Sequence, residues 1–257
     1  MTPVRHINVQ GVRVSALNPD LASEVIHQAI TAGDRGYICV QNVHGITKAQ
    51  SDPALRKVLD NALLITPDGV PIVWLGRLAG DPTIRRVYGP DLMLRICEEG
   101  VPRGYRHFLY GGKAGVVEKL QASLKKKFPG IQIVGNHTPP FRPLSQSEEK
   151  DLISEVRKAK PDIVWVGLST PKQDHFMAEH IHKLDTTLMF GVGAAFDFHA
   201  GLVPQAPSWM QACGLEWLFR LLTEPRRLWR RYFYSNPIFV FRVACELLGF
   251  KRRQSFN

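Results

Sequence analysis

The sequence predicts an α/β fold, in which a largely parallel sheet is covered by helices on both faces and is followed by a helical C-terminal appendage. Short apolar runs with the length of buried strands alternate along the chain with longer amphipathic segments. After Pro204 the hydrophobic period becomes helical, and no further strand pattern occurs. The chain of 257 residues is also long enough to bury the core that such a sheet requires.

Each element has its own signal. Residues 7–17 alternate apolar and polar around Gly11, which predicts a β-hairpin or a bulged strand, and Asn18-Pro19 then predicts a helix to about residue 30. The later strands are expected at residues 37–41, 63–66, 107–110, 131–135, 162–167 and 187–192. The helices between them are expected at residues 53–61, 70–78, 116–128, 147–159 and 173–184. Residues 137–145 are expected to be the least ordered stretch.

The C-terminal part is predicted to be helical, with Pro207, Pro225 and Pro237 each at the start of a helix, where proline is well tolerated. We expect a domain boundary near Ala206. It divides the chain into a main domain, residues 1–205, and an appendage, residues 206–257.

Most of the positive charge lies in the appendage. The formal net charge is +10, and residues 220–257 hold nine Lys and Arg against two Glu. This asymmetry indicates an anionic partner, either a membrane surface or nucleic acid. The arginines interleave with aliphatic and aromatic residues, which favours an anionic leaflet, and no RNP strand, Cys/His finger or basic zipper accompanies them.

The cysteines and the apolar runs indicate the compartment. Cys39, Cys97, Cys213 and Cys245 are far apart and have no metal-ligand or disulfide spacing, which fits a reducing cytosol. The N-terminal residues lack a secretory apolar region, and no run reaches the roughly 18 apolar residues of a membrane span. We therefore expect a cytoplasmic protein that contacts the inner face of the membrane peripherally.

Polar and glycine residues follow the predicted strands where those strands end. In parallel sheets, ligands bind outside these carboxyl ends. The residues concerned are Asn42, His44, Asp68, Gly111, Gly112, Lys172, Gln173, Gly193 and Asp197. Each is a candidate for the binding site.

Three familiar kinds of site are disfavoured. Phe196 occupies the last position of a dinucleotide-binding glycine motif, and no P-loop occurs. The stretch GLSTP lacks the closing glycine of a hydrolase nucleophile elbow. No D-x-D pair is present to hold a divalent metal against a diphosphate, so forked arginine donors are the natural substitutes. The candidates are Arg220, Arg226, Arg227, Arg230 and Arg231.

Six stretches, in order between about Asn42 and Pro237, together resemble the WecG/TagA/CpsF glycosyltransferase family. They are TPDGVPIVW, RVYGPDLM, YGGKAGVVEKL, VGLSTPKQDHF, GVGAAFDFHAG and APSWMQACGLEWLFRLLTEPRRLWRRY. The resemblance implies an inverting, metal-independent enzyme of bacterial surface-polysaccharide synthesis with no cofactor. Such an enzyme moves a sugar, of the N-acetylmannosamine or glucose type, from a UDP-sugar to a polyprenyl-diphosphate-linked sugar.

The resemblance also implies catalytic roles. Asp68 matches the aspartate of a P-D-G motif that is the proposed general base, and glycosyl transfer to a hydroxyl requires such a proton acceptor. Read without the family, an isolated P-D-G favours an ordinary turn aspartate at Asp68 over a functional one. Arg86 is the first residue of RVYGPD, which is similar to the family motif R-V-T-G-x-D, with Tyr88 in place of Thr. An arginine at this position can neutralise the negative charge that builds up on the departing UDP.

Other positions are expected to bind substrate. Gly89 and Asp91 match Gly-x-Asp, and Asp91 is expected either to hold a ribose hydroxyl or to cap the helix that begins at Pro90. Asn42 matches an asparagine of the family that lies near the sugar donor and the sugar acceptor. His44 replaces an acidic residue of the family, which leaves a role in sugar specificity or a purely structural one.

The remaining candidates complete the predicted site. Lys172 and Gln173 match the lysine and glutamine of the family motif S/T-P-K-Q-E, and Gln173 is suited to hydrogen-bond sugar hydroxyls. Asp197 is expected to help orient the sugars, and Gly193 lets the backbone approach a ligand closely. Gly111 and Gly112 precede a helix whose N-terminus suits an anion.

The sequence thus predicts a Rossmann-like catalytic domain over residues 1–205. The appendage, residues 206–257, would fold over the pocket, supply diphosphate-binding arginines and contact the membrane. The partners of the protein would be the UDP-sugar, the lipid-linked acceptor and an anionic membrane. The sequence is also compatible with a homo-oligomer. The alternatives are a non-catalytic nucleotide-sugar-binding protein and a nucleic-acid-binding protein that uses the basic tail.

Overall fold

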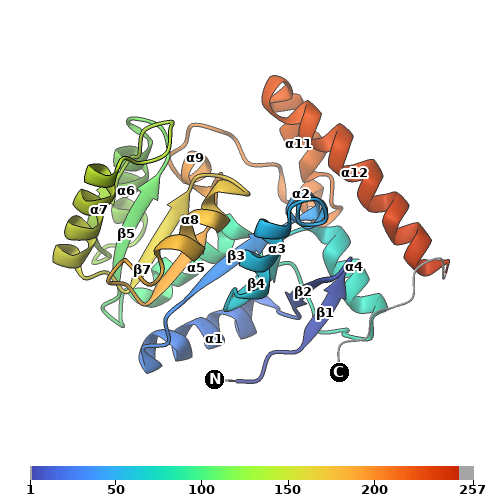
Figure 1. Ribbon diagram of the computed structural model, residues 1–257, viewed down its shortest axis with the longest axis horizontal. Helices are drawn as coiled ribbons and strands as arrows, with labels where there is room; N and C mark the ends of the chain where they lie inside the picture. The colour runs from blue at the N-terminus through green and yellow to red at the C-terminus, as the bar shows by residue number, and fades with distance from the viewer. Residues whose placement is uncertain (1, 249–257) are drawn as a thin grey trace.

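The computed structural model describes residues 2–248 and contains a six-stranded sheet with helices on both faces (Figure 1). The strands are β3 (Gly36–Gln41), β4 (Leu64–Pro67), β5 (Arg106–Gly111), β6 (Gln132–His137), β7 (Ile163–Gly167) and β8 (Leu188–Gly191). They lie in the order β4-β3-β8-β7-β5-β6, and every neighbouring pair is parallel. The predicted fold class is therefore confirmed.

The N-terminal segment forms the hairpin alternative. Strands β1 (His6–Val9) and β2 (Val12–Ser15) pair antiparallel in a separate two-stranded sheet. Gln10 and Gly11 make the turn with φ of 52° and 85°, the left-handed backbone that a two-residue hairpin loop requires. Asn8 Oδ1 accepts a hydrogen bond from the Gly11 N–H at 2.6 Å.

The helices bury the sheet in two layers. One face is covered by α1 (Pro19–Ala32), α5 (Gly89–Gly100), α6 (Val116–Lys127) and α9 (Ala195–His199). The other is covered by α2 (Val43–Ala49), α3 (Pro53–Asp60), α4 (Val70–Leu78), α7 (Gln146–Ala159) and α8 (Lys172–His180). Side chains alternate along a strand, so Ile38 and Leu64 pack in the first layer whereas Cys39 and Ile65 pack in the second.

Several helix starts follow from local chemistry. Asn18 caps α1 by accepting hydrogen bonds from the Asp20 and Leu21 N–H groups, and Pro19 occupies the first turn. Ser145 and Glu148 form a capping box at the start of α7. Residues 138–144, before this box, contain no helix or strand.

The structure differs from the prediction at short elements and at one proline. Helices α2 and α9 have seven and five residues, too few for a hydrophobic period to reveal them. The prediction that Pro237 starts a helix is wrong, because it lies inside α12 (Pro225–Leu247). Proline removes one backbone donor there, and buried residues on both sides of it, Leu228 and Phe239, hold the helix in place.

The appendage consists of α10 (Ser208–Ala212), α11 (Glu216–Thr223) and α12. Figure 1 shows α12 beside α2, the helix that follows β3, and the two helices pack together. Gln10 Nε2 donates to the Phe239 carbonyl at 3.1 Å, so the hairpin also contacts α12. None of the helices in residues 2–248 combines the length and the apolar character needed to cross a membrane.

Candidate active site

Two cavities meet at Asp68, at the carboxyl edge of the sheet. The first, which we call the polar cavity, has a volume of about 60 Å³ and lies between the ends of β3 and β8 and arginines of α11 and α12. The second, the apolar groove, has a volume of about 710 Å³ and lies between α4 and the appendage. Four residues line both: Asn42, Asp68, Tyr88 and Arg220.

Asp68 directly follows β4, and its backbone N–H donates to the Gln41 carbonyl at 3.0 Å. This bond brings it next to Asn42, whose Nδ2 donates to Asp68 Oδ2 at 3.5 Å. Asn42 caps α2 by accepting from the His44 N–H at 3.1 Å, and its Oδ1 also accepts from Arg231 Nη2 at 3.3 Å. Asn42 therefore connects the carboxylate to α12.

Arg86 lies on the other side of Asp68. Its Nη2 is 3.6 Å from Asp68 Oδ1, and its Nε donates to the Asp68 carbonyl. The guanidinium stacks on the Tyr88 ring, 4.0 Å from the centroid, and also donates to the Glu216 carboxylate. Tyr88 Oη donates to the same carboxylate at 2.8 Å. Glu216, on α11, thus attaches the appendage to the arginine of the core.

The environment of Asp68 shifts the pKa of its side chain. Burial raises the pKa of this carboxyl above its ordinary value and the Glu216 carboxylate adds to the rise, whereas Arg86 and Arg220 act in the opposite direction. Its Oδ1 is buried and accepts no hydrogen bond from the described residues. A carboxylate with a raised pKa is a stronger proton acceptor, which is the property that a general base needs.

Gln173 presents an amide oxygen to the polar cavity. Its side chain is buried, and Nε2 donates to the Gly191 carbonyl at 2.8 Å, which fixes the orientation of the amide. Oε1 has no hydrogen-bond partner among the described residues. It would lie 3.3 Å from a Cβ at Gly193, whose φ of 54° favours glycine. Gln173 can therefore accept a hydrogen bond from a ligand hydroxyl.

Three of the five candidate arginines line the polar cavity, namely Arg220, Arg227 and Arg231. Arg227 and Arg231 are four residues apart and so share one face of α12. The Nε atoms of Arg220 and Arg231 are buried without a hydrogen-bond partner among the described residues. Arg226 and Arg230 are exposed and line neither cavity.

The structure brings only some of the other candidates to the site. Gly89 lines the polar cavity, whereas Asp91, Gly111, Gly112, Lys172 and Asp197 line neither cavity. Asp91 is exposed, and no side chain caps α5, so the capping alternative is wrong. A Cβ at Gly111 would lie 2.8 Å from the Gly167 backbone, so close packing of β5 on β7 accounts for this glycine.

His44 lines the apolar groove and joins α2 to α12. Its Nδ1 is 2.9 Å from Ser235 Oγ, and Thr47 Oγ1 donates to the Ser235 carbonyl at 3.4 Å. Burial, together with the positive charges of Arg231 and Lys48, lowers the pKa of His44 to about 3. The imidazole is therefore neutral at physiological pH and supports a structural contact.

We expect acid to weaken this contact. The pKa of a histidine in an unfolded chain is about 6.5, so the unfolded chain binds the proton more tightly than the folded one. The stability that His44 contributes is complete above that value and is lost as the pH falls from there toward 3. Between pH 7.5 and pH 5, the melting temperature of the wild type should fall further than that of His44→Gln. Equal falls in the two proteins would contradict this role.

Sequence reasoning missed Glu216. An acidic residue at a helix start is commonly explained by the helix dipole, and Glu216 lies 130 residues from Arg86, so no local pattern reveals the pair. The sequence marks Tyr88 only as a departure from the threonine of the family motif. Its hydrogen bond to Glu216 shows why a phenol at this position is useful.

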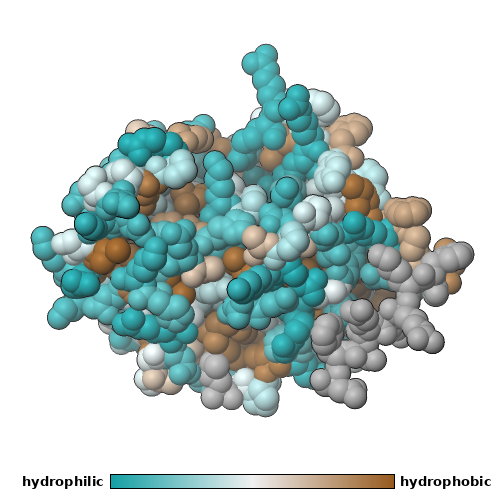
Figure 2. All heavy atoms as spheres, viewed as in Figure 1, coloured by the Kyte–Doolittle hydropathy of each residue, from teal (hydrophilic) through white to brown (hydrophobic). Residues whose placement is uncertain are grey.

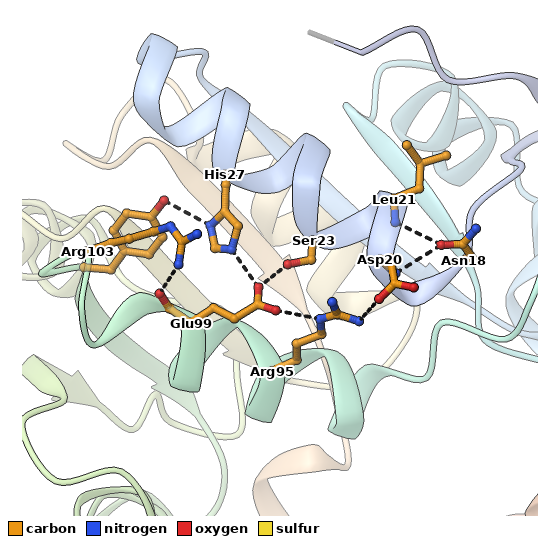
Figure 3. Close-up of polar contacts among 9 residues, drawn as sticks. Asn18, Asp20, Leu21, Ser23, His27, Arg95, Glu99 and Arg103 are labelled. Carbon is orange, nitrogen blue, oxygen red and sulfur yellow. Dashed lines mark hydrogen bonds and ion pairs between the residues drawn. The ribbon is translucent and has the colours of Figure 1, made fainter.

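A second polar cluster, on α1 and α5, is satisfied internally (Figure 3). Glu99 accepts hydrogen bonds from Ser23 and from Arg95 Nε, and its Oε2 is 2.7 Å from His27 Nε2. Although burial opposes it, these hydrogen bonds lower the pKa of Glu99 to about 2. Such a carboxylate is a poor base, and the cluster serves to join the two helices.

Possible metal ligands gather elsewhere. Within residues 2–248, Glu149, Glu179 and His180 form the only trio close enough to share an ion, and the trio includes neither Asp68 nor Glu216. Lys183 Nζ already donates to both glutamates, at 2.6 and 3.1 Å. The trio is therefore part of an ion-pair network, and none of its residues lines either cavity.

Comparison with known proteins gives consistent matches over most of the chain. The sequence model described as "Glycosyl transferase WecG/TagA/CpsF family" matches residues 7–253. An N-acetylglucosaminyldiphosphoundecaprenol N-acetyl-beta-D-mannosaminyltransferase of Bacillus spizizenii is 31% identical over 227 residues, which cover 87% of this chain and 86% of that protein. Proteins with the same name from Bacillus subtilis and Staphylococcus aureus are 28% and 26% identical, over 92% and 81% of this chain and 80% and 79% of their own.

Proposed function

The chain belongs to the WecG/TagA/CpsF family of glycosyltransferases, and from that premise we propose that it transfers a sugar from UDP to a sugar carried on polyprenyl diphosphate. The transferred sugar is of the N-acetylmannosamine or glucose type, and its anomeric configuration inverts. The relatives named above are N-acetylmannosaminyltransferases that act on N-acetylglucosaminyldiphosphoundecaprenol, which supports the first of these sugars and this class of acceptor.

The observation that carries the proposal is the position of Asp68 between two cavities of opposite character. The polar cavity offers arginines and an unpaired amide oxygen, which suit a nucleotide sugar. The apolar groove offers a hydrocarbon-like surface, which suits a lipid-linked acceptor. A transferase has to bring two such substrates together at one base, and Asp68 lines both cavities.

The proposed reaction is a single displacement. Asp68 accepts the proton of the acceptor hydroxyl while that oxygen forms a bond to the anomeric carbon of the donor. The bond between this carbon and the diphosphate oxygen breaks, and its electron pair leaves with UDP. Arg86, Arg220 and Arg231 stabilise the charge that develops on the diphosphate, and Asn42 and Gln173 bind sugar hydroxyls. Attack opposite the leaving group inverts the configuration.

Donor binding requires the appendage to move. Pockets for small molecules usually have volumes of about 300–1,000 Å³, whereas the polar cavity has about 60 Å³. The side chains of Arg220, Arg227 and Arg231 close it from the appendage side. A shift of α11 and α12 away from the sheet would admit the nucleotide, and their return would place the arginines on its phosphates.

The outer face of α12 supports contact with an anionic membrane. Trp229, Phe233 and Phe241 are 48%, 72% and 69% exposed, and Arg226 and Arg230 are exposed on the same helix. Exposed aromatic rings beside arginines are typical of a helix that lies at a lipid interface. The enzyme would then meet its acceptor at the inner face of the cell membrane.

The proposal is tested by incubating the protein with UDP-N-acetylmannosamine or UDP-glucose and with an acceptor in which N-acetylglucosamine is linked to a lipid through a diphosphate. We expect a disaccharide-lipid product by mass spectrometry, with an inverted anomeric centre by NMR. A thermal-shift screen of UDP-sugars would identify the donor, since a ligand that binds only the folded chain raises its melting temperature. Stabilisation by a UDP-sugar without product would instead indicate a non-catalytic binding protein, and a steep salt dependence of binding to DNA or RNA would indicate the nucleic-acid alternative.

We also expect turnover to survive excess EDTA. The sequence contains no D-x-D pair, and the three arginines at the polar cavity can supply the positive charge that a metal would otherwise provide. Initial rates with and without EDTA should agree within about twofold. Loss of turnover in EDTA and its recovery with Mg²⁺ or Mn²⁺ would show that arginines do not suffice.

A further inference from the structure

Several large apolar side chains that line the apolar groove are open to solvent. Trp74 and Leu78 of α4 are 54% and 67% exposed, and Val240 and Leu247 of α12 are 65% and 60% exposed. All four line the groove, which therefore lies between these two helices. Figure 1 shows where α4 and α12 lie in the fold. Figure 2 shows hydrophobic residues gathered along α12 in the same view. Exposed apolar side chains that cluster in this way are typical of a binding site.

The groove is lined by two kinds of side chain. Asp68, Arg86 and Arg220 are polar residues of the candidate active site, and Asp68 and Arg86 lie within ion-pair distance of each other. Aliphatic and aromatic side chains of α4 and α12 form much of the remaining lining. A nucleotide would leave this apolar lining exposed to water, and a neutral hydrocarbon would make no use of the polar residues. Arg86 and Arg220 already pair with Glu216 and Glu224, so the groove does not require an anion to balance their charge. A ligand that covers the apolar lining and also reaches Asp68 has a polar end and a hydrocarbon tail.

We propose that this groove binds the first isoprenoid units of the acceptor's lipid chain, which leaves the reaction centre between α4 and α12. This inference rests on the proposed function, because it concerns the acceptor of that reaction. Asp68 lines the same groove, so an acceptor whose hydroxyl reaches Asp68 would extend its own diphosphate and lipid chain along the apolar lining. Each methylene buried there contributes about fourfold to affinity, so acceptor recognition extends beyond the sugar and the diphosphate.

Val240 and Phe241 allow lipid binding in the groove to be tested separately from contact with the membrane surface. The two residues are adjacent on α12 and are 65% and 69% exposed, but only Val240 lines the groove. A glutamate at either position is accessible to water and should not prevent folding. Leu78 provides a second probe, on the opposite wall.

Direct binding to the full chain tests the inference without turnover. Farnesyl diphosphate and inorganic pyrophosphate are titrated into the wild type and into Val240→Glu, Leu78→Glu and Phe241→Glu, with calorimetry as the readout. We expect farnesyl diphosphate to bind the wild type at least roughly 100-fold more tightly than pyrophosphate. Val240→Glu and Leu78→Glu should each weaken farnesyl diphosphate binding by roughly tenfold or more and leave pyrophosphate binding and the melting temperature unchanged. Phe241→Glu should retain farnesyl diphosphate binding and weaken binding to anionic liposomes.

Two outcomes would overturn the inference. One is equal affinity of the wild type for the two diphosphates, and the other is an equal loss of farnesyl diphosphate affinity in Val240→Glu and Phe241→Glu. A failure of the proposed function has a different signature, since it appears as no transfer from any UDP-sugar by the wild type, whatever the binding result. If transfer does occur, Val240→Glu should raise KM for a long-chain acceptor and leave KM for an acceptor with a methyl group in place of the chain unchanged.

Discussion

Replacing Asp68 with Asn is expected to lower kcat by roughly 10² to 10⁴-fold, the usual cost of losing a proton-transfer group. The amide keeps the size and polarity of the carboxyl but cannot accept the proton of the acceptor hydroxyl. Binding of the UDP-sugar should remain nearly unchanged, because the arginines that face the polar cavity are intact. Steady-state kinetics give kcat, and calorimetry with the UDP-sugar gives donor affinity.

The pKa of Asp68 supplies two further readouts. Only the ionised carboxyl acts as a base, so kcat/KM of the wild type should rise with pH as Asp68 loses its proton. Because burial raises the pKa of Asp68, the midpoint of this rise should lie above the ordinary pKa of an Asp side chain, about 3.9. A folded-state pKa above the unfolded value means that ionisation of Asp68 reduces stability as the pH rises through the folded pKa. Asp68→Asn removes this cost, so its melting temperature at neutral pH should not fall.

The exposed Asp34 provides a matched control, and Asp34→Asn should have normal kinetics. Near-normal turnover of Asp68→Asn would remove this residue from the mechanism. A low kcat accompanied by a large drop in melting temperature would instead assign it a structural role.

The second large effect is expected for the arginines that face the polar cavity. Arg220→Ala and Arg231→Ala should each lower kcat by about 10² to 10³-fold, the range measured when one donor to a developing negative charge is removed. Both side chains line the cavity and have buried Nε atoms without a hydrogen-bond partner among residues 2–248. Arg231→Lys should recover only part of the activity, because an ammonium keeps the charge but loses the forked donor geometry.

Arg230 is the matched control for Arg231, since the two are adjacent on α12 and only Arg231 lines the polar cavity. Arg230→Ala should retain kcat on a soluble acceptor and weaken binding to anionic liposomes by about 1 kcal/mol. Arg226→Ala should behave in the same way. If Arg230→Ala and Arg231→Ala lose kcat equally, the division of α12 into a catalytic and a membrane face is wrong.

Much of the fold could be predicted from local patterns. The strand β3 and the helix α1 each carry a strong signal within their own residues, an apolar run in one case and an Asn-Pro start in the other. Parallel pairing followed because helices separate the strands. The short helices α2 and α9 and the continuation of α12 through Pro237 could not be predicted, since packing against the rest of the chain stabilises them.

The candidate site was predicted in part. Motifs selected Asp68, Arg86, Asn42 and Gln173 as functional residues, and the structure brings them to the two cavities that meet at the carboxyl edge of the sheet. Their catalytic roles remain predictions that the variants above test. The division into a main domain and an appendage near Ala206 likewise remains a prediction.

By itself, the sequence determined the fold class, the family and the residue types available for chemistry, because these depend on periodicity and on short motifs. Only the tertiary structure decided which arginines face the polar cavity, because the five candidates lie on several sides of two helices and their orientation depends on how those helices pack. The same holds for the pairing of Glu216 with Arg86 and for the groove between α4 and α12. Contacts between residues more than a hundred positions apart are set by packing, and no local pattern encodes them.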